Sequence, residues 1–501
     1  MPFAVSTSGA THSLRRCATM SAHRHVTESA LSRSDALAAA SDYFDSGAFR
    51  ADLARRIAYR TESQEPASGP VLRSYLVDEL IPAVAKLGFA ARVVDNPVAG
   101  CGPMLVGERH QRADLPTVLA YGHGDVVRGY DEQWRKPLTP WSLVVEGDRW
   151  YGRGTADNKG QHSIVLGALQ SVLAARSERP GFNVKLLIET GEEVGSPGLH
   201  AACAALREEL AADVLIASDG PRLAAQQPTI FLGSRGSVNF ALTLRLREGG
   251  HHSGNWGGLL RNPATVLASA IASMVSKDGV MRVDGLRPPP IPDDVRRALA
   301  DIAMRPGPGD PAIDEGWGEP GLSASERVFG WNTLEVLALK SGNADRPVNA
   351  IPPSAIACCQ LRFVVGTDWR QLGDRIREHL DAHGFTGIEV AVEDGNAATR
   401  LSPEHPWVRW AAASVKATTG KAPAILPNLG GTLPNDAFSE LLGLPTIWIP
   451  HSYPGCSQHA ADEHLLAPVA REGLQIMAGL FWDLGEPSAT PHDPGDRARG
   501  S

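Results

Sequence analysis

Two adjacent carboxylates, Glu192 and Glu193, are the side chains whose types and spacing first suggest chemistry. They follow the apolar, branched run 184–188, which predicts a buried strand. Carboxylates at the end of such a strand are costly unless positive charge lies beside them. That charge could be a surface lysine, or a metal ion held by one carboxylate while its neighbour handles protons. Taken alone, a Glu-Glu pair more often lies in a solvated acidic turn. The choice between these interpretations therefore depends on ligand-type residues elsewhere in the chain.

A histidine and an aspartate two residues apart follow another predicted strand. The apolar run 116–121 leads into His123 and Asp125. Side chains two residues apart on an extended chain point the same way, so Asp125 can orient the imidazole of His123. A histidine hydrogen-bonded within a core turn is the common structural alternative.

Two more ligand-type residues follow strands farther along the chain. Asp219 comes after the run 213–217, and His459 lies in the loop that follows the run 445–449. His451, two residues after the last of these strands, is the rival of His459.

A glycine-rich segment at 150–160 carries Asp157 just before a helical pattern at 160–173. The structural interpretation is that Asp157 caps this helix. The functional interpretation is a carboxylate whose two oxygens bridge two cations. The segment itself leaves both open.

The alternation of strands with helices predicts an α/β fold, with a mainly parallel sheet and helices on both faces. In such sheets, ligands bind beyond the carboxyl ends of the strands. Side chains that follow several separate strands therefore converge on one edge of the sheet. That convergence predicts a site.

The middle of the chain has a different pattern. From residue 236 to residue 395, the order strand-helix-strand-strand-helix-strand predicts a smaller α+β sandwich inserted into the larger domain. Within it, residues 283–320 hold many Pro and Gly and predict a long loop or insertion.

Composition excludes several classes of protein. The 501 residues carry a formal net charge of −8 and no run of Lys or Arg with interleaved aromatics, which disfavours nucleic-acid binding. The six cysteines form no CxxC pair, so a reducing cytoplasm is expected. No apolar run of about 18 residues predicts a membrane span. Residues 1–27 lack Asp and Glu, which predicts a disordered tail in preference to a transit peptide.

Taken together, the motifs resemble the M20 family of metallopeptidases, over nearly all of residues 35–485. This family includes carnosinase-type dipeptidases, glutamate carboxypeptidases, aminoacylases and acetylornithine deacetylases. The motifs that carry the resemblance are Gly122-His123-Gly124-Asp125, Gly152-Arg153-Gly154-Thr155-Ala156-Asp157-Asn158-Lys159-Gly160, Glu192-Glu193-Val194-Gly195-Ser196, Ser218-Asp219-Gly220 and the late His459.

The resemblance implies a site for two divalent metal ions. His123 and Asp219 would bind one ion, Glu193 and His459 would bind the other, and Asp157 would bridge both. Zinc suits two neutral imidazoles with carboxylate oxygens, and manganese or cobalt would also fit such ligands.

The resemblance also implies roles for residues that bind no metal. Glu192 would be the general base, Asp125 would clamp His123, and Asp157 would form a cis peptide with Asn158. His252 would donate a hydrogen bond to the oxyanion in the active site of a partner subunit, so a homodimer through the smaller domain is expected. The alternative is that His252 only ties down a glycine-rich turn.

Substrate contacts follow from the same resemblance. Arg362 would pair with a substrate carboxylate, as an arginine fork suits that task. Asn349, Gly430, Gly431 and Thr432 match other substrate-binding positions. Each of these residues also has a structural interpretation, as a strand arginine, a turn asparagine or the start of a helix.

The predicted function is hydrolysis of the amide bond of dipeptides or short peptides with a free carboxylate. The alternatives are hydrolysis of N-acyl amino acids by the same chemistry, and a non-catalytic ligand-binding module on the same fold. The predicted organisation is a disordered tail at 1–30, a catalytic domain in two parts at 31–235 and 396–485, a lid and dimerisation domain at 236–395, and a flexible tail at 486–501.

Overall fold

The computed structural model describes residues 32–304, 311–486 and 490–491. The tail predicted at 1–30 lies outside the described residues, and so does most of the tail predicted at 486–501. In the described residues, no helix is both long enough and apolar enough to cross a membrane.

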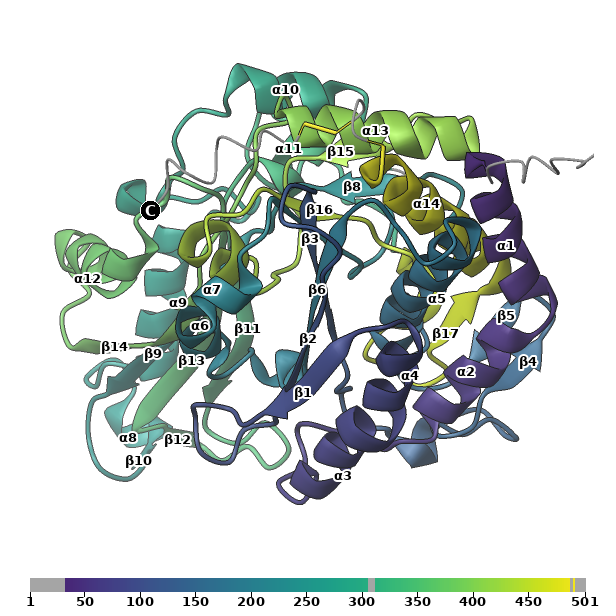
Figure 1. The fold of residues 1–501 in the computed structure, drawn as a ribbon. Coiled ribbons are helices and arrows are strands. Elements are labelled where there is room, and N and C mark those ends of the chain that lie inside the picture. The colour runs from purple at the N-terminus through teal and green to yellow at the C-terminus, as the bar shows by residue number, and fades with distance from the viewer. Residues whose placement is uncertain (1–31, 305–310, 487–489, 492–501) are drawn as a thin grey trace, which may run out of the picture.

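One large sheet organises the chain (Figure 1). Four neighbouring strands at its centre are parallel to one another, and antiparallel pairs occur toward both edges. The sheet is therefore mainly parallel at its core, as the alternation of strands and helices predicts. Its order is β1 (Ala90–Val94), β2 (Met104–Arg109), β6 (Asn183–Glu189), β3 (Thr117–His123), β7 (Val214–Ala217), β16 (Thr446–Trp448), β8 (Thr229–Phe231) and β15 (Ala424–Leu426).

Helices cover both faces of this sheet, and each face has its own apolar core (Figure 1). One face is covered by α1 (Arg33–Asp45), α2 (Ala48–Ile57), α5 (Lys159–Ala175), α13 (Pro406–Thr419) and α14 (Ala467–Leu484). The other face is covered by α6 (Leu199–Ala205), α10 (Asp293–Ala300), α11 (Ala324–Phe329) and the turn η6 (Ala437–Leu441). All residues of α5 except Gln170 and Ala174 are buried, because this helix lies between the sheet and other helices.

The helices near the start of the chain are irregular. The helices α1 and α2 separate at Gly47, whose φ is +83°. Farther along, α3 (Gly69–Ser74), the π-turn η1 (Tyr75–Leu80) and α4 (Ile81–Lys86) follow one another without a break. Pro82 follows the π-turn within this helical run and supplies no N–H to it, and helices are commonly distorted next to such a proline.

A second, antiparallel sheet has the order β11 (Thr333–Ser341), β13 (Ser354–Phe363), β9 (Gly236–Arg245) and β14 (Ile388–Asn396). Together with α9 (Pro263–Met274) and α12 (Leu372–Ala382), these strands follow the predicted order strand-helix-strand-strand-helix-strand. Alternate residues of β9 are buried against the helices, which gives this layer a core of its own. Figure 1 shows the layer beside the large sheet. The domain boundaries at 236 and 395 stay a prediction.

Residues 283–320 were predicted to form a long loop or insertion, and the described part of this segment is not a loop throughout. The segment contains the turn η4 (Asp284–Leu286) and the helix α10. Val295 and Leu299, on one face of α10, are buried against the large sheet, and two aspartates occupy its first turn. Tertiary packing therefore stabilises a short helix between proline-rich flanks.

Small sheets fix the loops around these layers. β10 (His251–His252) pairs with β12 (Ala350–Ile351), and α8 (Ser253–Trp256) follows β10 directly. β17 (His464–Leu466) pairs with β5 (Arg149–Tyr151), which also pairs with β4 (Val144–Glu146). The remaining short elements are α7 (Arg207–Leu210), η2 (Asp131–Gln133), η3 (Glu192–Val194), η5 (Trp369–Gln371) and η7 (Pro454–Cys456).

Candidate metal centre

Three adjacent parallel strands, β6, β3 and β7, deliver acidic and imidazole side chains to one edge of the sheet. His123 is the last residue of β3. Glu192 and Glu193 open the turn η3, three residues after β6 ends, and Asp219 lies two residues after β7. The carboxyl ends of these strands therefore place the side chains where the fold predicts a ligand site.

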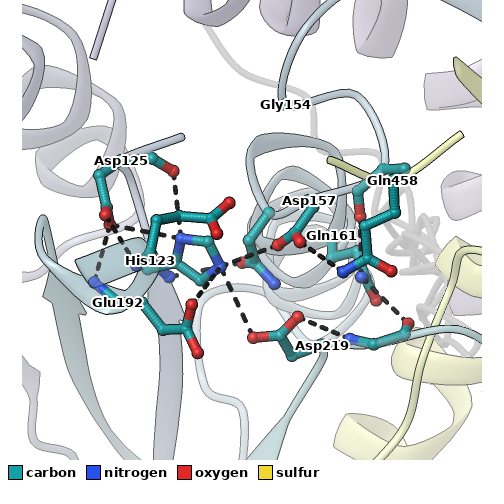
Figure 2. A network of polar contacts seen from close by, with 12 residues as sticks. His123, Asp125, Gly154, Asp157, Gln161, Glu192, Asp219 and Gln458 are labelled. Atoms are coloured by element: carbon teal, nitrogen blue, oxygen red, sulfur yellow. Dashed lines mark hydrogen bonds and ion pairs between the residues drawn. The ribbon is translucent and has the colours of Figure 1, made fainter. Parts of the chain in front are cut away.

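His123, Asp157 and Asp219 form the first of two groups that could hold a metal ion, and all three are buried. The Nε2 of His123 lies 3.0 Å from Asp157 Oδ1 and 3.6 Å from Asp219 Oδ2 (Figure 2). The Nδ1 of His123 lies 3.1 Å from the backbone oxygen of Asp125. An Nδ1–H donor at that contact leaves the lone pair on Nε2 directed at the carboxylates, as metal ligation requires.

The second group consists of Asp157, Glu193 and His459. The Nε2 of His459 lies 3.0 Å from Asp157 Oδ2 and 3.0 Å from Glu193 Oε2. The loop that carries His459 holds three non-glycine residues at positive φ, and His459 itself has a φ of +61°. Strained backbone of this kind clusters at functional sites.

His451 belongs to neither group among the described residues. Its ring is buried and packs closely on Gly473 of α14, where a Cβ would lie 2.8 Å from its Nδ1. The geometry therefore favours His459 over His451 as the histidine of the second group.

Asp157 belongs to both groups and does not cap α5. The N-cap of that helix is Asn158, and the Asp157–Asn158 peptide is cis, as expected. The two carboxylate oxygens of Asp157 face different histidines, Oδ1 toward His123 and Oδ2 toward His459. This is the arrangement required of a bridging carboxylate.

Asp125 lies under the site and contacts more than His123. Its Oδ1 is 3.3 Å from His123 Nδ1. Its two carboxylate oxygens also accept hydrogen bonds from the backbone N–H groups of Glu192, at 3.2 Å, and Glu193, at 3.1 Å. One buried carboxylate thus fixes the imidazole and the turn that presents both glutamates (Figure 2).

The electrostatics of the cluster favour bound cations. Burial, and then repulsion by Asp157, raise the pKa of Glu193 to about 7 and that of Asp219 to about 6. Burial also raises the pKa of Glu192 well above its usual range. The Oε1 of Glu193 is buried and has no hydrogen-bond partner in the described part of the chain. Positive charge among these groups would offset the repulsion and satisfy that oxygen, so the donor set fits divalent metal ions.

The sequence of the chain agrees with this geometry. A sequence model of peptidase family M20/M25/M40 matches residues 119–483. The chain belongs to this family. M20 membership makes it a metal-dependent hydrolase of the peptidase class.

Known proteins similar to this M20 chain include two enzymes and a solved structure. A cysteinylglycine-S-conjugate dipeptidase of Corynebacterium striatum is 26% identical over 358 residues, which are 68% of this chain and 75% of the relative. A succinyl-diaminopimelate desuccinylase of Methylobacterium sp. (strain 4-46) is 28% identical over 456 residues, 88% of this chain and 96% of the relative. The crystal structure of an M20 family metallo-carboxypeptidase from Sulfolobus solfataricus matches with a TM-score of 0.73 and 24% identity, over 87% of this chain and 99% of that one, which shows the fold.

Glu463 supports the M20 site, although the motifs gave it no role of its own. Its buried carboxylate accepts hydrogen bonds from the backbone N–H groups of Gly154, Ala156 and Asp157, and from Arg153 Nη1 at 2.6 Å. It therefore holds the loop that positions the bridging aspartate. The only sequence signal was its place four residues after His459.

Two glutamines complete the surroundings of Asp157. Gln458 donates a short hydrogen bond to Asp157 Oδ2. Gln161 donates to the backbone oxygens of Ala156, at 2.9 Å, and Gly220, at 3.2 Å (Figure 2). Neither glutamine could be singled out from the sequence, because each contacts a residue that is far away along the chain, Asp157 for Gln458 and Gly220 for Gln161.

Replacing Glu463 by glutamine should destabilise the protein by about 3–5 kcal/mol, because Arg153 would be left buried without its carboxylate partner. The amide would also turn a donor toward N–H groups that need an acceptor. Urea unfolding measures the loss. The matched control is Glu404→Gln, which removes an exposed partner of Arg297 and should change stability by less than about 1 kcal/mol. Equal stability of the two variants would contradict the role given to Glu463.

The predicted substrate residues fall into two separate places. Arg362, near the end of β13, donates from Nη1 to Thr432 Oγ1 at 2.7 Å. Gly430 and Gly431 belong to the same turn, and the Gly430 oxygen accepts from Arg235 Nε at 2.9 Å. These contacts bring four of the five residues predicted to bind substrate, all except Asn349, to one place.

His252 and Asn349 lie close to each other, at a different place in the smaller layer from Arg362. β10 and β12 pair His252 with Ala350, and Ser253 donates from its backbone N to the Asn349 oxygen at 2.8 Å. This end of the smaller layer is opposite the end that carries Arg362. At about 3.3 Å per residue, the eight steps of β13 from Ser354 to Arg362 span about 26 Å. Within one chain, the structure does not bring His252 to Arg362.

Proposed function

We propose that this M20 protein uses two divalent metal ions to hydrolyse the amide bond of dipeptides or short peptides with a free carboxylate. The two residue groups that share Asp157 support a dinuclear site. Zinc suits this mixture of imidazoles and carboxylates, and manganese or cobalt also fits it. His123 and Asp219 would hold one ion, and Glu193 and His459 the other.

Glu192 is the general base of the proposed reaction. Cations held at the site would supply charge that lowers the pKa of a water molecule and polarises the scissile carbonyl. Glu192 belongs to neither group, yet its Oε2 lies 4.0 Å from His123 Nε2. Its carboxylate is therefore free to take a proton from the attacking water and pass it to the leaving nitrogen.

His252 has the tautomer that an oxyanion donor needs. Its Nδ1 accepts a hydrogen bond from the backbone N of Gly254 at 3.2 Å. Because a backbone N–H can only donate, Nδ1 carries no proton, and a neutral ring then has its N–H at Nε2. The His252 side chain is exposed, so this N–H is available to another molecule.

A homodimer would place His252 at the active site of the partner subunit, because within one chain His252 is far from Arg362. The length of β13, which separates His252 from Arg362 within one chain, supports the action of His252 in the partner subunit. The strand β11 forms one edge of the smaller sheet, and its Leu337 and Leu339 are 58% and 55% exposed. An unpaired strand edge with exposed apolar side chains favours association with a second copy.

Mixing two inactive variants tests this arrangement. His252→Ala and Glu192→Gln should each be nearly inactive, because each removes one part of the site. After dissociation and reassembly of an equal mixture, about one quarter of wild-type activity should return, since half of the dimers are mixed and each has one complete site. Action of His252 within its own chain would leave the mixture inactive. Separately purified, unmixed samples of each variant are the control.

Arg362 supports a substrate with a free carboxylate. Its Nε donates to Gln360 Oε1 and its Nη1 to Thr432 Oγ1, so the guanidinium is held in one orientation. No carboxylate of the described residues lies within 4.0 Å of it. An arginine held in this way can bind a substrate carboxylate. The dipeptidase of Corynebacterium striatum supports a peptide substrate.

An N-acyl amino acid is the second candidate substrate, favoured by the similarity to a desuccinylase. Both classes place a carboxylate next to an amide bond, so the geometry of Arg362 suits either. Metal analysis of the purified protein, followed by turnover assays with dipeptides and with acetylated and succinylated amino acids, separates the two. We expect hydrolysis of dipeptides that a chelator abolishes.

Metal binding without turnover of any amide would contradict the proposed function and favour a non-catalytic binding module. Turnover of acylated amino acids alone would favour the second candidate. The expectation of a cytoplasmic location stays a prediction.

A further inference from the structure

A cavity of about 380 Å³ lies where the smaller sheet meets α11. Its volume falls within the ~300–1,000 Å³ range of small-molecule sites. Neither of the two candidate metal groups contributes to its lining, and neither does Glu192 or Arg362. The established family chemistry therefore does not account for it.

One wall of the cavity carries a guanidinium whose hydrogen-bonding capacity is not fully used. Arg235 donates from Nε to the Gly430 oxygen, and its Nη1 is buried without a hydrogen-bond partner among the residues that the structure describes. No carboxylate of the described residues lies within 4.0 Å of Arg235. Burial, and then the nearby charge of Arg362, lower the pKa of Arg235 to about 10. A partly buried cation in this state favours a ligand that brings a carboxylate.

Two carboxylates, Asp314 and Glu335, line the same cavity. Glu335 forms no ion pair within 4.0 Å in the described residues. The other cation of the lining, Arg327, already donates to the backbone oxygens of Trp317 and Leu322. Glu335 is close enough to attract Arg235 without forming that ion pair. The cavity thus offers a cation and an anion that are each incompletely paired.

Four further residues of the lining are apolar. Trp317, Met304, Ile313 and Val328 contribute aromatic and aliphatic surface. A ligand that matches all three features carries a carboxylate, an ammonium and an apolar group on a small frame. We infer that this cavity binds a free α-amino acid with an apolar side chain.

The cavity is connected to the turn that holds Arg362. Thr432 Oγ1 donates to the backbone oxygen of Arg235 at 3.0 Å and accepts from Arg362 Nη1 at 2.7 Å. The Arg235 side chain contacts the same turn at the Gly430 oxygen, so a carboxylate bound to Arg235 acts on the turn that holds Arg362. Occupancy of the cavity changes KM for substrate more than kcat. This coupling rests on the proposed role of Arg362, whereas amino-acid binding does not.

Isothermal titration calorimetry with L-leucine on the metal-loaded protein tests the binding. Leucinamide, which lacks the carboxylate, and 2-hydroxy-4-methylpentanoate, which lacks the ammonium, should each bind about tenfold more weakly or worse. Trp317→Ala and Glu335→Gln should also weaken L-leucine binding about tenfold. Glu389→Gln, an exposed change on β14 of the same sheet, is the matched control and should leave binding unchanged.

Absence of saturable L-leucine binding overturns the inference. Binding that survives in both Trp317→Ala and Glu335→Gln also overturns it, because the amino acid would then lie elsewhere, as a product at the metal site would. If L-leucine raises KM in the wild type and not in Trp317→Ala, the result supports coupling between the cavity and Arg362. An equal rise of KM in both proteins would contradict this coupling. Because binding is measured without turnover, failure of the proposed hydrolysis is a separate result.

Discussion

Replacing Glu192 by glutamine should lower kcat by about 10³-fold or more while the metal content stays at the wild-type level. The amide keeps the size of the side chain but has no oxygen basic enough to take a proton from water. Glu192 is in neither of the two candidate metal groups, so its loss should not release an ion. The fold should also survive, because the backbone N of Glu192, and not its side chain, is held by Asp125.

The neighbouring variant, Glu193→Gln, is the matched comparison. It has the same change of chemistry one residue away, but Glu193 belongs to the second group. We expect Glu193→Gln to lose metal as well as activity. Metal content by atomic spectroscopy and kcat by a peptide assay therefore distinguish the two glutamates. Turnover retained in Glu192→Gln, or equal metal loss in both variants, would contradict the assignment of the base.

The part of the site that the sequence predicts is the part set by strand ends. His123, Glu193 and Asp219 each follow a short apolar run, and a parallel sheet brings the ends of such runs to one edge. Periodicity and order along the chain contain this information. The same signals predict the two layers of the fold, because strands of period two and helices of period 3.6 differ locally.

The contacts that hold the site are not local, and the sequence does not predict them. Glu463 pairs with Arg153, 310 residues earlier in the chain, through the pairing of β17 with β5. These strands have three residues each, too few for a periodic pattern to appear. The helix α10 was missed for a related reason, since only Val295 and Leu299 of its eight residues are buried.

Distance along an element is also invisible to motif comparison. His252 was predicted to act in the active site of a partner subunit and Arg362 to bind substrate, and the structure places the two at opposite ends of the smaller layer. The sequence shows both motifs but not that a ten-residue strand lies between them in space. That separation turns the expectation of a dimer into a geometric requirement of the proposed mechanism.

Replacing Asp157 by asparagine should reduce metal content more than any other single change at the site, and activity should fall below detection. Asp157 is the one residue that both groups share, with Oδ1 facing His123 and Oδ2 facing His459. An asparagine keeps one oxygen and turns an NH₂ donor toward the other histidine, so at least one ion loses a ligand and meets a donor instead.

The comparison with variants of a single group makes this prediction specific. Asp219→Asn affects only the first group and Glu193→Gln only the second, so each should retain about one ion where the wild type retains two. Chelation should lower the melting temperature of the wild type, because metal that binds only the folded chain contributes about 4 kcal/mol at a thousand times its Kd. The same chelator should leave Asp157→Asn almost unchanged. Equal metal content in Asp157→Asn and Asp219→Asn would show that Asp157 serves one ion only, and the dinuclear mechanism would then fail.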